Sequence, residues 1–403
     1  MLCRLRRSIA LTVLTTCLTA ASGQVAVSVP SSAADSTSSG LATDISASLV
    51  ISDRGPRFIS SFGHCSIRLT CPSAGLDNYY TYLIHSDASN VLMFFTHGIS
   101  RGHYAMLKWD EFSSDYTEQN RTITEYPLNL TTDEVRQLWM NLDRETYNPL
   151  SRSYSFLHSQ CASISADIIQ HSLDGEHIHY LTLPPDMTGT ERDFALRATQ
   201  NYPWYQFVFM CLLGREGEQP EKLTEMLTPT LIAPVWTQAV FENEHGESRP
   251  VFAGEPHVLY EGTFTPHKHS PFTPPVVFAA LALLMVLLSI ANLRGHLLRL
   301  GKIVDGVLLA VQTLVGCLIV YLYFFSLATW GPGNALLPVF NPLPFLLWLV
   351  FRHRTWFRWG MAVCAAVVAG MMIAACFIPQ LGAGHVALFA VLLVRLIYQF
   401  IKK

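Results

Sequence analysis

Acidic side chains are almost absent from the last third of this 403-residue chain. Residues 268–403 contain ten Lys and Arg but a single acid, Asp305. Residues 8–267 have the opposite balance, with 14 Lys and Arg against 29 Asp and Glu. Such an acidic segment lacks the basic face that nucleic-acid binding requires, which excludes that class of protein. The two parts of the chain are therefore expected in different environments, the acidic part in water and the last third in a membrane.

Cysteine is also sparse, with nine residues scattered along the chain and no CxxC motif. No Cys/His pair has the spacing of a zinc site, so we expect neither a structural metal nor a cofactor. The small number and wide scatter of the cysteines also exclude a secreted disulfide scaffold. One pair, Cys65 and Cys71, stays open as a disulfide in an oxidising compartment.

The N-terminus has the three parts of a secretory signal peptide. Arg4, Arg6 and Arg7 form a basic region, residues 9–18 are apolar, and small residues follow at 20–23. The apolar run is too short to span a bilayer comfortably. We expect a signal peptide over residues 1–24 and a flexible Ser/Ala-rich leader over 25–45.

Residues 46–265 have the mixed periodicity of an α+β domain. Alternating or Tyr-rich apolar patterns predict strands at 62–69, 79–84, 94–95 and 122–128. Helices are expected from Thr131 or Thr132, where Glu134 completes a capping box, from Cys161, and over 190–201. The short apolar stretch 204–213 is typical of a buried core segment, with contact to a membrane surface as the alternative.

Beyond residue 271, five apolar runs predict an all-α bundle of about five transmembrane helices, at 272–293, 303–325, 335–351, 359–378 and 385–401. Lys and Arg concentrate after the first, third and fifth runs, and the other two connections carry no charge. This alternation places the soluble domain outside the cytoplasm. Prolines within the third run predict a segment packed inside the bundle.

Two residues of the soluble domain have the chemistry of a nucleophilic dyad. Cys161 is placed at a helix N-terminus, where the helix dipole favours the thiolate. His64 on a neighbouring strand is positioned to take the thiol proton. From spacing alone, a buried Cys and a structural His are the commoner outcomes. Asp77 or Thr81 on the next strand are the alternatives for orienting His64.

Further residues have two interpretations each. Gln160, directly before the Cys, is placed either to donate to an oxyanion or to cap the helix. Arg68 and Arg121 are able to attract a phosphate headgroup, although strand-edge solvation is the commoner role. Cys65 falls on the strand face opposite His64 and is expected in the core. His158, three residues before Cys161, is interpreted as a surface or loop residue.

Short motifs spread over most of the chain carry a family resemblance. They lie at residues 61–69, 77–82, 95, 98, 104, 121, 128–130 and 154–161, and at Asn334 with Asn341-Pro342-Leu343. In these motifs the chain resembles the Lnb N-terminal periplasmic domain family, whose members are similar to circularly permuted NlpC/P60-type papain-like folds with His before Cys. It departs from the family at Gln160, usually Asn, at Ser163, usually Thr, and at Cys65, usually Ser, Thr or Ala.

The resemblance implies an acyltransferase of the bacterial inner membrane with its soluble domain in the periplasm. Its members are linked to N-acylation of the lipidated N-terminal Cys of lipoproteins, which implies a phospholipid acyl donor and a diacylated lipoprotein acceptor. In this chemistry Cys161 would form a thioester, with His64 as base. From the residues themselves we expect Asp77 as a third catalytic residue and Gln160, Ser163, Arg68 and Arg121 as binding residues. Two alternatives stay open: a cysteine peptidase or amidase acting on cell-wall peptide, and a non-catalytic membrane assembly or binding module.

Overall fold

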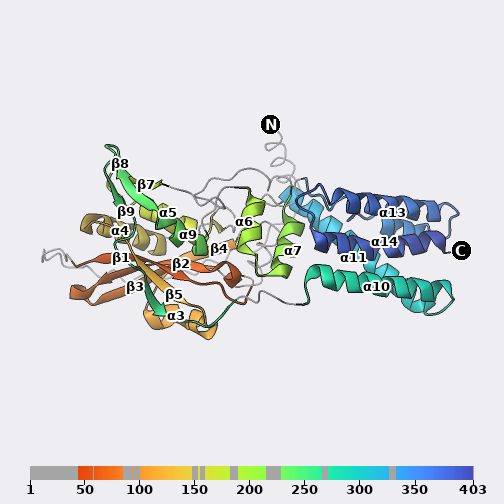
Figure 1. Ribbon diagram of the computed structural model, residues 1–403, viewed down its shortest axis with the longest axis horizontal. Coiled ribbons are helices and arrows are strands. Elements are labelled where there is room, and N and C mark those ends of the chain that lie inside the picture. Colours follow the sequence, from red (N-terminus) through yellow and green to blue (C-terminus); the bar gives the residue numbers. More distant parts are fainter. Residues whose placement is uncertain are drawn as a thin grey trace, which may run out of the picture.

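The computed structural model describes residues 44–57, 59–84, 93, 100–147, 153–154, 159–181, 189–214, 228–265, 271–325 and 333–402. A domain built around a β-sheet occupies one end of the molecule and a bundle of long helices occupies the other (Figure 1). The signal peptide and leader predicted over 1–45 lie almost wholly outside the described residues, as do the strand predicted at 94–95 and His158.

The main sheet has seven strands in the order β10-β5-β1-β2-β3-β4-β6. Their bounds are β1 Ser46–Ser52, β2 His64–Cys71, β3 Leu76–Ile84, β4 Ser100–Leu107, β5 Ile123–Pro127, β6 Ser153–Tyr154 and β10 His257–Tyr260. All neighbours pair antiparallel. Three of the predicted strands are therefore found, at 62–69, 79–84 and 122–128, with ends that differ by a few residues.

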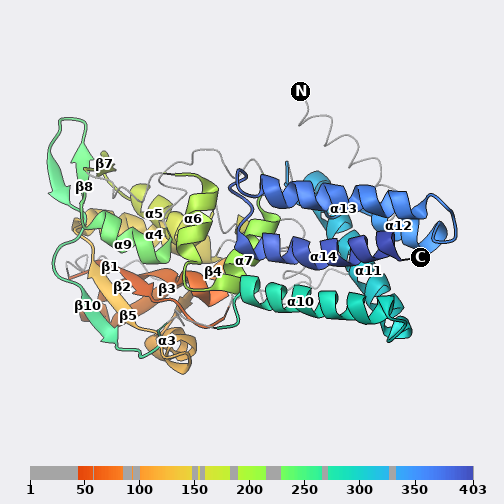
Figure 2. The same cartoon turned by 45° about the vertical axis from the view of Figure 1, so that its right-hand side comes forward.

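Helices cover both faces of this sheet (Figure 2). On one face lie α4 (Thr132–Tyr147), α5 (Cys161–Gln170) and α9 (Pro229–Trp236), and on the other lies α3 (Trp109–Glu118). The first core contains Ile67 and Leu138, and the second, smaller core contains Val50, Tyr79 and Phe112. The period-2 alternation of β2 therefore separates two buried environments rather than core from solvent.

The predicted capping box of α4 is present. The Thr131 hydroxyl accepts the Glu134 backbone N–H at 3.3 Å, and the Glu134 carboxylate accepts the Thr131 N–H at 2.7 Å. The part of the soluble domain that the structure describes also contains α6 (Glu191–Ala198) and α7 (Pro203–Leu212). A separate three-stranded sheet, in the order β7-β8-β9, comprises Glu176–Tyr180, Ala239–Asn243 and Ser248–Pro250.

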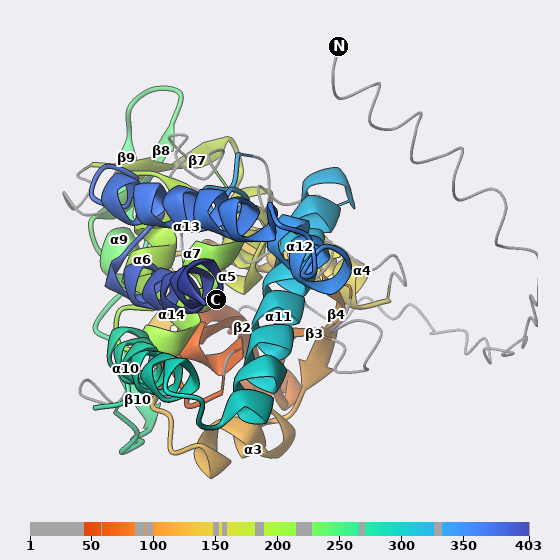
Figure 3. The same cartoon turned by 90° about the vertical axis from the view of Figure 1, so that its right-hand side faces the viewer.

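Four helices in the described part of the chain are long and apolar enough to cross a membrane: α10 (Pro274–Leu293), α11 (Leu298–Phe325), α13 (Phe357–Ala374) and α14 (Ala383–Ile401). Helix α14 runs between α10 and α13 (Figure 3). The third predicted span differs, because its only regular helix is the eight-residue α12 (Leu343–Val350). Pro338 and Pro342 explain this difference, since proline removes a helical N–H and clashes with the preceding turn.

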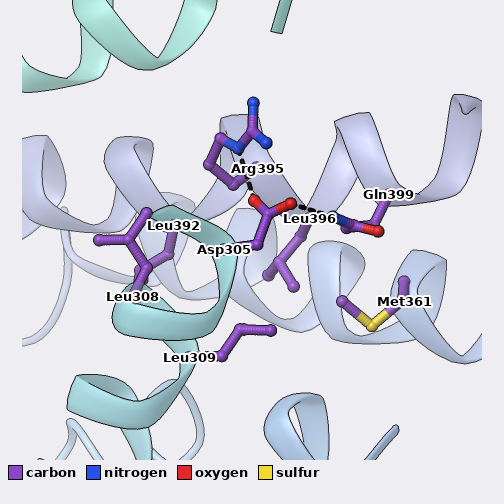
Figure 4. Close-up of a pocket in the computed structure, with 8 residues that line it drawn as sticks. All are labelled: Asp305, Leu308, Leu309, Met361, Leu392, Arg395, Leu396 and Gln399. Atoms are coloured by element: carbon purple, nitrogen blue, oxygen red, sulfur yellow. Dashed lines mark hydrogen bonds and ion pairs between the residues drawn. The ribbon is translucent and has the colours of Figure 1, made fainter. Parts of the chain in front are cut away.

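A buried ion pair joins the helices at the end of the bundle remote from the sheet. The Arg395 Nε on α14 donates to the Asp305 carboxylate on α11 at 2.7 Å, and Gln399 donates to its other oxygen (Figure 4). The Ser289 hydroxyl on α10 accepts from the same guanidinium at 2.8 Å. Asp305, the single acid of the C-terminal third, is therefore fully paired.

Candidate functional site

His64 is the first residue of β2, at the end of the sheet nearest the bundle. It follows Gly63, whose φ of +79° is a conformation that disfavours side chains. A Cβ at Gly63 would also lie 2.9 Å from the Ser52 carbonyl oxygen. The glycine thus sets how the chain enters β2 and where the imidazole begins.

The half-buried imidazole of His64 is held by a hydroxyl network. Its Nε2 lies 2.7 Å from the Thr81 Oγ1 on β3, and the Ser66 hydroxyl donates to the same oxygen at 3.0 Å. In the tautomer that carries its proton on Nε2, the imidazole donates to this oxygen. The Nδ1 atom is then the one left to act as a base.

Tyr116 and Arg121 enclose the other side of the imidazole. The Tyr116 ring stacks on His64 with centroids 6.1 Å apart, and the Arg121 guanidinium lies 4.7 Å from the centroid of the Tyr116 ring. Burial, and then the positive charge of Arg121, lower the pKa of His64 to about 3. The imidazole is therefore neutral at physiological pH, which is the state that a general base requires.

Cys161 is the first residue of α5 and is almost fully buried, as predicted for a thiol at a helix start. Burial and then Cys161 raise the pKa of the Cys65 thiol, and Cys161 also contributes to the raised pKa of the buried Tyr116 phenol. Cys65 faces the α5 side of the sheet, whereas Tyr116 belongs to α3 on the other side. Cys161 therefore lies near Cys65 and near the Tyr116 phenol, whose ring stacks on His64.

Gln160 and Ser163 shape the start of α5. The Ser163 hydroxyl accepts the Gln160 backbone N–H at 3.0 Å and lies 3.1 Å from the Gln160 carbonyl oxygen. Ser163 is thus engaged in capping the helix. The Gln160 side chain is 1% exposed, and its Nε2 has no hydrogen-bond partner among the residues that the structure describes. A buried, unpaired amide beside the thiol is suited to donate to an oxyanion.

Asp77 does not orient His64, which corrects one of the two sequence hypotheses. In the register of β2 and β3, Asp77 pairs with Thr70, and Thr81 pairs with Ser66. Six residues of strand separate His64 from Thr70, which is roughly 20 Å. The Asp77 carboxylate instead accepts two bonds from Arg68, both at 2.8 Å. Thr81, the other candidate, is the partner of the imidazole.

The two arginines predicted to attract a phosphate have different surroundings. Arg68 is committed to Asp77 and to Glu125, whose carboxylate it reaches at 2.9 Å, and it stands four residues along β2 from His64. Arg121 is 2% exposed, so strand-edge solvation does not describe it. Its Nε donates to the Asp53 carbonyl oxygen at 2.7 Å, and its Nη2 has no partner among the described residues.

The other sequence hypotheses on cysteines have clear outcomes. Cys65 is buried in the core, as predicted. Cys65 and Cys71 are not joined by a disulfide. They lie six residues apart on the same extended strand, roughly 20 Å, and disulfide geometry does not allow that separation. The Cys71 thiol instead contacts the Asp44 carboxylate at 3.5 Å.

Helix α7 packs between the part of the soluble domain near His64 and the membrane helices. The Phe62 ring, two residues before His64, packs edge-on against Phe209 of α7 at 5.6 Å. On the other side of α7, the Phe207 ring lies 5.3 Å from Phe278 of α10 and 4.8 Å from His385 of α14. Helix α7, expected as a buried core segment, therefore has one face in the core of the soluble domain and another against the bundle.

Polar side chains of the bundle cap the C-terminal end of α7. Asn334 donates to the Cys211 carbonyl oxygen at 2.9 Å, and Gln380 donates to that of Met210 at 3.0 Å. The last carbonyls of a helix have no partner within the helix, so these two amides complete it. His385 accepts the Gly382 N–H at Nδ1, which leaves its Nε2–H to donate to the Cys211 sulfur at 3.4 Å. The soluble domain is thus fixed on the bundle.

One group of side chains in the described residues has donor atoms suited to a metal ion, and it lies apart from this site. His177 and His179 on β7 and Glu242 on β8 place their ligand atoms within 4.8 Å of one another. The His179 Nδ1 is 3.3 Å from the Glu242 carboxylate. Sequence spacing did not indicate this group, because the strand pairing of β7 with β8 creates it.

The fold and the site together define a membrane protein whose sheet-based domain holds a Cys, a His and a supporting Thr beside a helical bundle. Two family models match the chain: the Lnb N-terminal periplasmic domain over residues 36–187 and the Lnb transmembrane domain over residues 266–403. The chain belongs to the Lnb family, as the sequence motifs indicated, and has a periplasmic N-terminal domain. No curated protein and no solved structure matches it.

Proposed function

We propose that this protein is a membrane-bound acyltransferase that N-acylates the lipidated N-terminal Cys of bacterial lipoproteins. The observation that carries the proposal is that the core containing Cys161 also contains Leu322 of α11, while Phe62, two residues before His64, packs on Phe209 of α7. Both substrates of this reaction are lipids anchored in a membrane. A site held at the membrane surface receives them in a favourable orientation, which a soluble enzyme would not provide.

The first half-reaction loads the enzyme with an acyl chain. The His64 Nδ1 takes the Cys161 thiol proton as the sulfur attacks an ester carbonyl of a phospholipid. The carbonyl oxygen becomes an oxyanion, which the Gln160 amide is placed to stabilise. Collapse breaks the ester C–O bond, and the leaving alkoxide takes the proton from His64. The products are lysophospholipid and a thioester on Cys161.

The second half-reaction transfers the chain. The α-amine of a diacylated lipoprotein attacks the thioester carbonyl and gives a proton to His64. Collapse breaks the C–S bond, forms the amide and returns the proton to the Cys161 sulfur. A thioester reacts readily with an amine, and the buried site of Cys161 limits competing hydrolysis.

The orientation follows from the basic loops. Arg294 lies between α10 and α11, Arg299 lies in the first turn of α11, and Arg352 and Arg354 lie between α12 and α13, at the end remote from the sheet. Under the positive-inside rule this end is cytoplasmic, which places the chain in the inner membrane with its site on the periplasmic side.

The test is the N-terminal mass of a lipoprotein after incubation with purified enzyme and phospholipid. Cys161→Ala and His64→Ala should each abolish the gain of one acyl chain, whereas Cys376→Ala, a change at an exposed cysteine, should not. Full activity in either site variant would refute the dyad. Cleavage of peptidoglycan fragments without any acylation would assign the same residues to an amidase.

A further inference from the structure

We propose that a cavity of about 260 Å³ at the N-terminal end of α7 binds the phosphodiester headgroup of a glycerophospholipid. The inference rests on the proposed acyltransferase function and names the binding site of its donor. The cavity is lined by Pro56, the aromatic residues Tyr202, Trp204 and Tyr205 around the start of α7, and Phe264. It therefore lies at the boundary between the soluble domain and the membrane helices.

The aromatic wall is held in place by hydrogen bonds at its polar ends. The Tyr202 hydroxyl donates to the Gly55 carbonyl oxygen at 2.9 Å, and the Tyr205 hydroxyl donates to that of Pro56 at 3.2 Å. The Trp204 indole donates to the Phe272 carbonyl oxygen at 2.8 Å, and its ring contacts Phe278 of α10 at 5.8 Å. Tyr and Trp in this arrangement are typical of the headgroup level of a bilayer.

Positive charge lies behind this wall. Arg54 interacts electrostatically with Tyr202, as does Arg121, whose buried Nη2 has no partner among the described residues. The one carboxylate that interacts with both guanidinium groups is Asp53, and burial raises its pKa. Among the described residues, two guanidinium groups and no carboxylate act electrostatically on Tyr202 in the cavity wall, which favours an anionic phosphate over the ammonium end of a headgroup.

The distance to the dyad fits the chemistry of the donor. Ser52 pairs with His64 across β1 and β2, and Arg54 follows two residues later. Paired strand residues lie about 5 Å apart, and two extended residues add at most roughly 7 Å. In a glycerophospholipid only the glycerol unit separates the phosphate from the acyl esters. A phosphate held near Arg54 therefore directs an ester carbonyl toward Cys161.

The test measures lipid binding by a variant that cannot turn over, so its result does not depend on catalysis. Full-length Cys161→Ala is titrated with phosphatidylglycerol or with diacylglycerol of the same chains, and each dissociation constant is measured. We expect Arg54→Gln to weaken phosphatidylglycerol binding about tenfold, the effect of one charge-assisted hydrogen bond, and to leave diacylglycerol unchanged. Arg54→Lys should restore most of the affinity.

Arg57→Gln is the matched control, because Arg57 is exposed and its guanidinium pairs with Asp115 at 3.0 Å. It should bind both lipids as the parent does. Inorganic phosphate distinguishes a free anion from a lipid: we expect millimolar phosphate to compete only weakly, since it lacks the chains. If Arg54→Gln binds phosphatidylglycerol as tightly as its parent, or loses affinity equally for both lipids, the proposal is overturned. Activity without this binding difference would leave the acyltransferase function intact.

Discussion

The Nε2 of His64 on β2 lies 2.7 Å from the Oγ1 of Thr81 on the neighbouring strand β3. A hydroxyl here takes the place that an amide or a carboxylate often has in such sites. It fixes the ring without adding a negative charge, so the pKa of His64 is set by burial and by Arg121.

Removal of the Thr81 hydroxyl should lower catalytic activity while the protein still folds. Thr81→Val keeps the shape of the side chain but releases the imidazole, and we expect kcat/KM to fall about 10- to 100-fold because the base is misoriented. Asp77→Asn is the control, since Asp77 pairs with Arg68. Initial rates of lipoprotein acylation measure both. A larger loss for the Asp77 variant would restore Asp77 as the orienting residue.

Substitution of Gln160 should lower activity without lowering the stability of the fold. Its buried Nε2 has no partner among the described residues, so Gln160→Leu removes an unpaired donor and should leave the melting temperature unchanged or higher. Loss of an oxyanion donor should lower kcat about 100-fold. Thermal unfolding and single-turnover acylation test the two effects, and a destabilised, active variant would contradict the assignment.

Ser163→Ala should behave in the opposite way. The Ser163 hydroxyl caps α5 through its contacts with the Gln160 backbone, and loss of a cap typically costs about 1 kcal/mol of unfolding free energy. Activity per folded molecule should stay within a few-fold of the parent. Denaturant unfolding combined with an activity assay distinguishes these roles, and a folded but inactive variant would place Ser163 in the chemistry.

The pH dependence follows from the neutral state of His64. Its pKa falls from 6.5 to about 3 on folding, so between these values the unfolded chain binds a proton that the folded protein does not. Stability is therefore complete above pH 6.5 and decreases as pH falls toward 3, by at most about 1.4 kcal/mol per pH unit from this group. Melting temperatures of parent and His64→Gln at pH 4 to 7 should converge in acid. A parallel pair of curves would contradict the lowered pKa.

The contribution of the buried Arg395–Asp305 ion pair to the stability of the bundle can be measured. Arg395→Met leaves the Asp305 carboxylate buried without its cation, which should cost about 3–5 kcal/mol. The double variant Arg395→Met with Asp305→Leu should recover much of this loss, because both charges are gone. Thermal unfolding in detergent measures the cycle, and additive losses would show that the pair does not couple.

Sequence patterns predicted the parts of this protein that depend on local physics. Apolar length located four long membrane helices, alternation located β2, and the capping box located the start of α4. The motifs also indicated His64 and Cys161. What they could not provide was register: only the pairing of β2 with β3 decides that Thr81, and not Asp77, reaches the imidazole.

Long-range packing explains the features that were missed. Tyr116 lies in α3, a helix that was not predicted from the sequence, and it contacts His64 because α3 packs on the far face of the sheet. The caps that Asn334 and Gln380 place on α7 join segments more than a hundred residues apart in sequence. No local pattern contains such partners.

The most direct measurement of the central claim is the intact mass of the full-length protein after incubation with phospholipid and no lipoprotein. The account predicts a gain of one acyl chain that maps to the peptide containing Cys161, is released by hydroxylamine, and disappears on adding a diacylated lipoprotein. His64→Ala should form it far more slowly. Transfer of acyl chains to lipoprotein by a protein that never carries one, or that carries it on another cysteine, would contradict the account.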